Sequence, residues 1–173
     1  MAYRQKSPKL QLPKNFHPKI GIVQAIFNKK ITDQQCAAAC TCLEKYNIKY
    51  DIIKVPGCFE IPYTLQQMAR TRHTKYHGLV AIGCLIKGRT RHFEVIARAV
   101  SQAIMDLSIK HNLPIGFGII TAESAPQART RINLGYEATY AVLATLINVS
   151  GLTPLSFWPS TFRGNGKGKG KGK

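Results

Sequence analysis

The chain has 173 residues, 45% of them hydrophobic, which suits a single domain with a substantial core. Its 25 lysine and arginine residues outnumber eight acidic residues, and the formal net charge of +17 points to anionic partners. Much of this charge lies at the ends, because residues 1–30 hold seven basic residues and residues 163–173 hold five. No apolar run reaches the roughly 18 residues of a membrane span, and the N-terminus lacks a secretory signal's apolar core. We therefore expect a soluble cytoplasmic protein.

Apolar runs of strand length alternate along the chain with longer segments of helical periodicity. In chain order, the sequence predicts strands at 19–27, 50–55, 77–86 and 114–121, and helices at 31–47, 58–72, 92–112, 124–132 and 136–152. Thr32 or Asp33 is the expected cap of the first helix, and Pro62 suits the first turn of the second. The helix over 92–112 has the clearest pattern, with apolar residues repeating at i, i+3 and i+4.

Four apolar strands separated by helices predict an α/β protein, a three-layer α/β/α sandwich around a four-stranded parallel sheet. The predicted organisation is a basic N-terminal arm (1–18), a domain (19–152) and a C-terminal extension (153–173). Because ligands of such sheets gather at the carboxyl ends of the strands, the loops after the strands should form one site.

Five cysteines occur, and Cys36, Cys40 and Cys42 fall within one helix-like segment. The sequence contains neither a Cys-x-x-Cys pair nor a cysteine and histidine spacing typical of a metal site. We interpret the cysteines as small buried side chains in a reducing compartment and expect no bound metal.

The loop after the third strand, GCLIKGRTRHF, leads into the clearest helix. Free backbone N–H groups at a helix start, together with the helix dipole, favour phosphate binding. Thr90 is the expected cap, and Gly88 lets the chain approach an anion closely. His92 falls in the first turn, and histidine is well suited to proton transfer near neutral pH. The loop matches neither GxxxxGKS/T nor GxGxxG, and a lone histidine there is also compatible with an ordinary surface position.

Five ordered motifs together resemble those of the lumazine synthase family. They are FN at 27–28, VPGCFEIP at 55–62, GCLIKGRTRHF at 83–93, PIGFGIIT at 114–121 and QARTR at 127–131. Members of this family condense 5-amino-6-(D-ribitylamino)uracil with 3,4-dihydroxy-2-butanone 4-phosphate, giving 6,7-dimethyl-8-ribityllumazine, phosphate and water. The resemblance implies this step of riboflavin biosynthesis, carried out on a flavodoxin-like fold with no cofactor or metal.

The same resemblance implies roles for individual residues. The ribitylaminouracil would contact Phe27, Cys58, Phe59, Glu60, Cys84, Leu85, Ile86 and Phe117. The butanone phosphate would be held by Arg89, Thr90 and Arg131, and His92 would transfer protons. Each role has a structural alternative, since strand aromatics are often core, a first-turn carboxylate suits the helix dipole, and an exposed arginine is often only solvated.

Some positions depart from the family's usual pattern. Lys87 stands where the family usually has Arg, Arg89 where it has Ala, and Arg91 where it has Pro. The linker between Arg131 and the last helix is also short, so the lysines that the family carries there are absent. We expect Arg89 and Arg91 to replace part of that charge, and expect the Lys87 ammonium to attract phosphate as a point charge.

Assembly and the tail leave alternatives open. The resemblance implies a homo-oligomer, a pentamer or an assembly of pentamers, in which Phe117 and Arg131 reach a neighbouring subunit's site. It leaves association with riboflavin synthase open. The tail GNGKGKGKGK is expected to be disordered and suits nonspecific contact with nucleic acid, or else simply improves solubility. The alternative to the enzyme is a catalytically weakened shell-forming or nucleic-acid-binding homologue.

Overall fold

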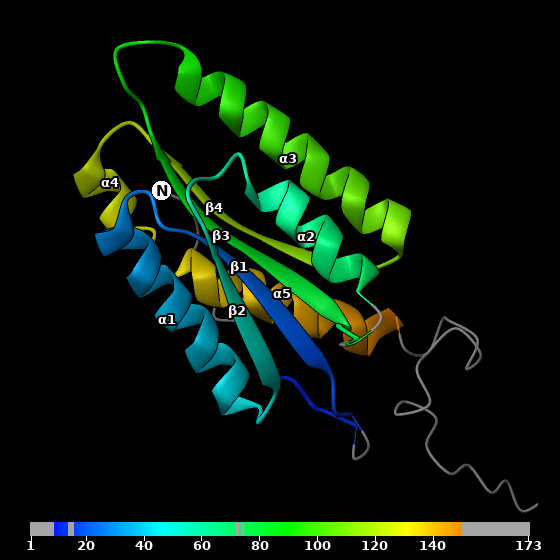
Figure 1. The fold of residues 1–173 in the computed structure, drawn as a ribbon. Helices are drawn as coiled ribbons and strands as arrows, with labels where there is room; N and C mark the ends of the chain where they lie inside the picture. The colour runs from blue at the N-terminus through cyan, green and yellow to red at the C-terminus, as the bar shows by residue number, and fades with distance from the viewer. Residues whose placement is uncertain (1–8, 14–15, 72, 74, 150–173) are drawn as a thin grey trace, which may run out of the picture.

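The computed structural model describes residues 9–13, 16–71, 73 and 75–149, along which strands and helices alternate (Figure 1). The strands are β1 (Lys19–Ala25), β2 (Lys49–Val55), β3 (Gly78–Ile86) and β4 (Ile115–Ala122). The helices are α1 (Lys29–Lys45), α2 (Ile61–Arg70), α3 (His92–His111), α4 (Ala125–Arg129) and α5 (Leu134–Val149). This alternation confirms the predicted α/β class.

The four strands form one parallel sheet in the order β2-β1-β3-β4. Figure 1 shows α1 and α5 on one face of this sheet and α2 and α3 on the other. The predicted three-layer α/β/α sandwich of flavodoxin-like type is therefore confirmed. Since β2 lies on one side of β1 and β3 on the other, the direction of winding reverses between β1 and β3.

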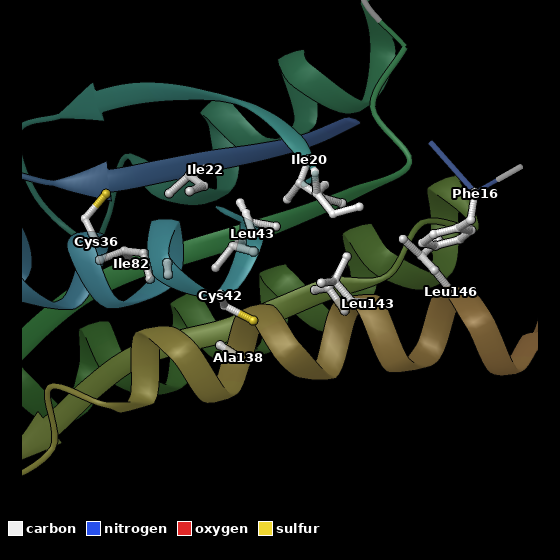
Figure 2. Packing of buried hydrophobic residues seen from close by; sticks show 14 residues of the cluster. Phe16, Ile20, Ile22, Cys36, Cys42, Leu43, Ile82, Ala138, Leu143 and Leu146 are labelled. Atoms are coloured by element: carbon white, nitrogen blue, oxygen red, sulfur yellow. The ribbon is translucent and has the colours of Figure 1, made fainter. Parts of the chain in front are cut away.

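The face beneath α1 and α5 carries a cluster of buried apolar side chains (Figure 2). Ile20 and Ile22 reach it from β1, because alternate residues of a strand share a face. Leu43 of α1 and Leu143 of α5 pack in the same cluster, and all four side chains are fully buried. Burial of a large aliphatic side chain stabilises a fold by about 1.5–3 kcal/mol, so this layer anchors the sheet. On the other face, Val23 packs with residues of α2 and α3.

Helix α5 approaches α1 very closely at Gly135. A Cβ atom at that position would stand 2.0 Å from the backbone carbonyl oxygen of Gln35. The Gln35 side chain is fully buried, and its Nε2 donates a hydrogen bond to the carbonyl oxygen of Gly118 on β4. The two helices and the sheet are therefore fixed against one another at one point.

The ends of the elements differ from prediction where they build the site. β1 ends at Ala25 rather than at residue 27, and α2 begins at Ile61 rather than at residue 58, with proline in its first turn as predicted. α1 begins at Lys29, so the expectation that Thr32 or Asp33 caps it is wrong. The cause is the left-handed backbone of Asn28, which ends the extended segment and starts the helix early.

Parts of the predicted organisation lie outside the described residues. These are residues 1–8 and 14–15 of the predicted arm, residue 72 at the predicted end of the second helix, residues 150–152 at the predicted end of the last helix, and the extension over 153–173. In the part of the chain that the structure describes, no helix combines the length and apolar character needed to cross a membrane.

Candidate active site

The loops after β1, β2 and β3 lie at the carboxyl edge of the sheet, where the winding reverses. Doubly wound sheets bind ligands at this point. Backbone hydrogen bonds join the first two loops, from Ile26 N to Val55 O (2.8 Å) and from Phe27 N to Pro56 O (3.1 Å). These bonds fix Phe27 beside the turn that follows β2.

Asn28 turns the chain from β1 into α1. Its backbone lies in the left-handed region, with φ at 59°, a conformation that asparagine tolerates better than most residues. Its side-chain Nδ2 donates a hydrogen bond to the carbonyl oxygen of Cys84 on β3 at 2.9 Å. Asn28 therefore joins the start of α1 to β3 across the reversal point.

A pocket of about 320 Å³ opens at this edge. Its lining residues are Phe27, Asn28, Gly57, Cys58, Phe59, Glu60, Cys84, Leu85, Ile86, Gly88, Thr90, His92, Phe93 and Ile96. A mostly apolar wall with a few convergent polar groups is typical of small-molecule sites. Among the described residues, no three His, Cys, Asp or Glu side chains come together as potential metal ligands.

Cys58 and Cys84 form a buried part of the wall. Burial raises the pKa of each thiol to about 11, so both are neutral at physiological pH. Gly83 allows the Cys58 turn to approach β3, because a Cβ atom there would stand 2.6 Å from the Cys58 sulfur. This wall therefore offers the ligand uncharged, polarisable contact and backbone groups.

Phe27 and Phe59 are exposed aromatic side chains at the pocket, with 69% and 64% of their surfaces open. Their rings offer flat apolar faces to a planar ligand. Glu60 lies beside Phe59, and its Oε2 accepts a hydrogen bond from Gly57 N at 2.9 Å. A carboxylate accepts several hydrogen bonds, so Glu60 retains capacity for ligand hydroxyls.

The loop from Gly88 to Arg91 projects beyond the sheet into the start of α3 (Figure 1). The structure records no acceptor among the described residues for the backbone N–H groups of Gly88, Arg89 and Thr90. These donors precede a helix of 20 residues, whose dipole favours negative charge at this end. The arrangement can bind an anion next to the pocket.

Thr90 and His92 lie where this loop enters α3. The N-cap residue is Arg91, so the prediction that Thr90 is the cap is wrong by one position. The Thr90 hydroxyl nevertheless accepts a hydrogen bond from His92 N at 3.4 Å. His92 opens the helix, as predicted, and its exposed side chain lines the pocket beside the free donors of the loop.

The expectation that the Lys87 ammonium attracts the substrate phosphate is not supported by its position. Its Nζ lies 2.9 Å from the Glu123 Oε2, and this ion pair raises the pKa of the lysine. Lys87 is also absent from the pocket wall. Its ammonium is therefore directed across the end of β3 toward β4, and not into the pocket.

Phe117, Arg89 and Arg131 do not line the pocket of their own chain. Phe117 pairs with Ala81 in the middle of the β3–β4 ladder, away from the carboxyl edge, and is 40% exposed. Arg89 is exposed in the loop, and Arg131 is exposed in the turn after α4. The other predicted site residues all line the pocket.

Four lining residues had no role predicted from the sequence: Asn28, Gly57, Phe93 and Ile96. Asn28 belongs to the FN pair, and an asparagine between a strand and a helix is itself a signal for a left-handed turn. Phe93 and Ile96 share the apolar stripe of α3 that packs on the sheet. At its N-terminal end this stripe lines the pocket instead.

Comparisons with known proteins agree with the motifs. A family model described as 6,7-dimethyl-8-ribityllumazine synthase matches residues 17–149. A protein of that name from Bartonella bacilliformis is 40% identical over 121 residues, covering 70% of this chain and 80% of the relative. One from Thermococcus kodakarensis is 35% identical over 130 residues, covering 72% of this chain and 82% of the relative. Another from Pyrococcus furiosus is 34% identical over 135 residues, covering 78% and 84%. The chain therefore belongs to the 6,7-dimethyl-8-ribityllumazine synthase family.

Proposed function

We propose that the chain catalyses the condensation of 5-amino-6-(D-ribitylamino)uracil with 3,4-dihydroxy-2-butanone 4-phosphate to 6,7-dimethyl-8-ribityllumazine, releasing phosphate and water. It is a transferase of riboflavin biosynthesis, as its relatives' names indicate. The observation that supports this most is one pocket that combines aromatic rings, a carboxylate and a histidine beside a loop with free N–H donors. The aromatic rings and the carboxylate suit the planar ring and the hydroxyl-bearing chain of the first substrate. The histidine and the free N–H donors suit the phosphate-bearing second substrate.

The pyrimidine substrate binds at the apolar end of the pocket. Phe27 stacks on the uracil ring, since its exposed ring face is available for a planar partner. Glu60 accepts hydrogen bonds from the ribityl hydroxyls, and Phe59 covers the chain. The backbone of residues 84–86 pairs with the uracil edge, next to the neutral thiols of the wall.

The phosphate substrate binds at the loop between β3 and α3. The free N–H groups of Gly88 to Thr90 and the Thr90 hydroxyl bind the phosphate oxygens, with Arg89 adding charge. The pyrimidine amine then attacks the ketone carbonyl carbon, and the carbonyl oxygen leaves as water. Phosphate leaves as its bond to carbon breaks and the neighbouring hydroxyl-bearing carbon loses a proton, which gives an enol that rearranges to a second carbonyl. The ribityl-bearing nitrogen attacks this carbonyl, the carbonyl oxygen leaves as a second water, and the ring closes. His92, at the loop end of the pocket, carries these protons.

Neighbouring subunits complete this site. Phe117 and Arg131 are exposed but lie outside the pocket of their own chain, so they can serve the pocket of another copy. Exposed apolar side chains on α3, Val95, Met105 and Ile109, support burial against a second copy. The assembly we propose is a pentamer or a set of pentamers, and native mass spectrometry measures it directly. A monomer at micromolar concentration would contradict it.

An assay with both substrates, followed by lumazine fluorescence, tests the activity. The wild type should form product, and His92→Ala should lower kcat by about 10²- to 10⁴-fold, the usual contribution of a general acid–base. His111→Gln is the matched control, because His111 lies on the same helix at the far end from the pocket. Absence of product with the wild type would refute the proposal.

The alternative of a catalytically weakened shell-forming or nucleic-acid-binding homologue is not favoured. The pocket argues against this alternative, because it still contains Phe27, Glu60, Thr90 and His92 together. A protein that had lost its chemistry would not be expected to keep all of them.

A further inference from the structure

Lys87 makes two separate contacts, one with the end of β4 and one with the turn that follows it. Its backbone N–H donates to the carbonyl oxygen of Ala122 at 2.9 Å, one residue beyond the last paired positions of the β3–β4 ladder. Its side-chain Nζ lies 2.9 Å from the Oε2 of Glu123, the next residue along. The base of the loop between β3 and α3 is therefore held through both main chain and side chain.

Glu123 stands on an ordered turn. Its backbone N–H donates to the Oε1 of Gln127, and Gln127 N donates to the Ser124 hydroxyl at 3.4 Å. Ser124 in turn is the N-cap of α4. The carboxylate that holds Lys87 thus has its own position fixed by hydrogen bonds within the same turn.

The rest of the loop has little else to define its shape. A Cβ atom at Gly88 would meet no atom within 4 Å, so this part of the loop is not packed. The backbone N–H groups of Gly88, Arg89 and Thr90 have no acceptor among the described residues. In the part of the chain that the structure describes, only the two ends of the loop, at Lys87 and at the start of α3, hold it in place.

We propose that Lys87 and Glu123 are positioning residues, whose ion pair holds the free N–H donors of the loop in the geometry that binds the substrate phosphate. This inference rests on the proposed function. Both partners are partly exposed, with side-chain exposures of 48% and 65%, so their pairing contributes little to overall stability. Its effect falls on the loop, whose middle has few other contacts with the described residues.

Steady-state kinetics of Glu123→Gln and Lys87→Met test the pair. Each variant should raise KM for the butanone phosphate about two- to fivefold, as expected for loss of an exposed ion pair, and leave KM for the ribitylaminouracil unchanged. The reversed pair, Lys87→Glu with Glu123→Lys, should recover most of the loss. Asp51→Asn is the matched control, because it breaks the partly exposed Lys19–Asp51 pair (2.7 Å) at the opposite end of the sheet, while the Asn oxygen can still accept the hydrogen bond from the Tyr76 hydroxyl.

A direct phosphate contact by Lys87 gives a different result. In that case Lys87→Met would raise this KM while Glu123→Gln, by freeing the ammonium, would lower it. That pattern, or a reversed pair no better than the single variants, would overturn the positioning role.

Titration with inorganic phosphate, followed by the amide NMR signals of Gly88 and Thr90, separates this inference from the proposed function. If the wild type forms no lumazine, the proposed function fails by itself. The positioning role then still requires that wild type bind phosphate at these amides and that Glu123→Gln and Lys87→Met both bind it more weakly. Equal binding by wild type and both variants, or no binding by any of them, would overturn it.

Discussion

Glycine serves opposite purposes at the contact between α1 and α5 and in the loop between β3 and α3. At Gly135 a Cβ atom would stand 2.0 Å from a backbone oxygen of α1, and at Gly116 one would stand 2.4 Å from a backbone oxygen of α5. At Gly88 it would meet nothing within 4 Å. The scaffold is therefore shaped by close packing, whereas the loop is shaped by a few polar anchors and stays open for a ligand.

The largest expected effect is that of Gly135→Ala on stability. The added methyl group overlaps the Gln35 carbonyl of α1, and helix backbone cannot move aside as a flexible side chain can. We expect the free energy of unfolding to fall by about 3 kcal/mol, the upper part of the usual range for overpacking. Urea denaturation measures it, and a loss below about 1 kcal/mol would show that the two helices separate easily.

Gly88→Ala should change substrate binding and leave the stability of the fold nearly unchanged. Gly88 has no positive φ and no close neighbour, so stability should stay within about 1 kcal/mol of the wild type. The methyl group should hinder approach of the phosphate to the loop N–H groups. KM for the butanone phosphate should rise about tenfold, roughly the value of one hydrogen bond to a charged group. A change in stability without a change in KM would contradict the comparison.

The smallest expected effect is a loss of folding stability at acidic pH. It should arise from a histidine of the scaffold and not from the loop. Burial lowers the pKa of His77, and its Nδ1 accepts a hydrogen bond from Lys19 N at 2.9 Å, which requires that nitrogen to be unprotonated. Below about pH 6.5 the unfolded chain gains a proton that the folded chain resists, so stability falls as pH drops toward the folded-state pKa.

His77→Asn tests this origin, because the Asn oxygen can accept the same hydrogen bond but does not titrate. The difference in Tm between pH 7.5 and pH 5 should be smaller in this variant than in the wild type. His92→Asn, in which the substituted histidine lies at the loop, is the comparison variant. If it reduced the Tm difference as much as His77→Asn does, the acid sensitivity would not come from the scaffold alone.

The sequence predicted the layers of the fold because each strand is an apolar run and each long helix has an apolar stripe. It did not predict which strand lies at the edge. Ile52 and Ile53 of β2 are 40% and 39% exposed, although their sequence resembles that of a buried strand. Strand order depends on how helices pack across the sheet, which short-range patterns do not record.

The site was predicted where it depends on strand ends, since Phe27, the turn at 58–60 and the loop at 88–92 all follow strands. The partner of Lys87 was not predicted, because Glu123 reaches it only through the register of β3 against β4. From its residue type alone, Lys87 is predicted to attract phosphate through its positive charge. The fold directs that charge to a carboxylate.

The two buried thiols of the pocket have a chemical consequence. With a pKa of about 11, only about one thiol in ten thousand is ionised at neutral pH, and the thiolate is the form that alkylating agents and peroxides attack. Cys58 and Cys84 therefore place sulfur atoms in the wall of the pocket in their unreactive thiol form. The wall of the pocket can therefore contain two cysteines and still resist alkylation and oxidation.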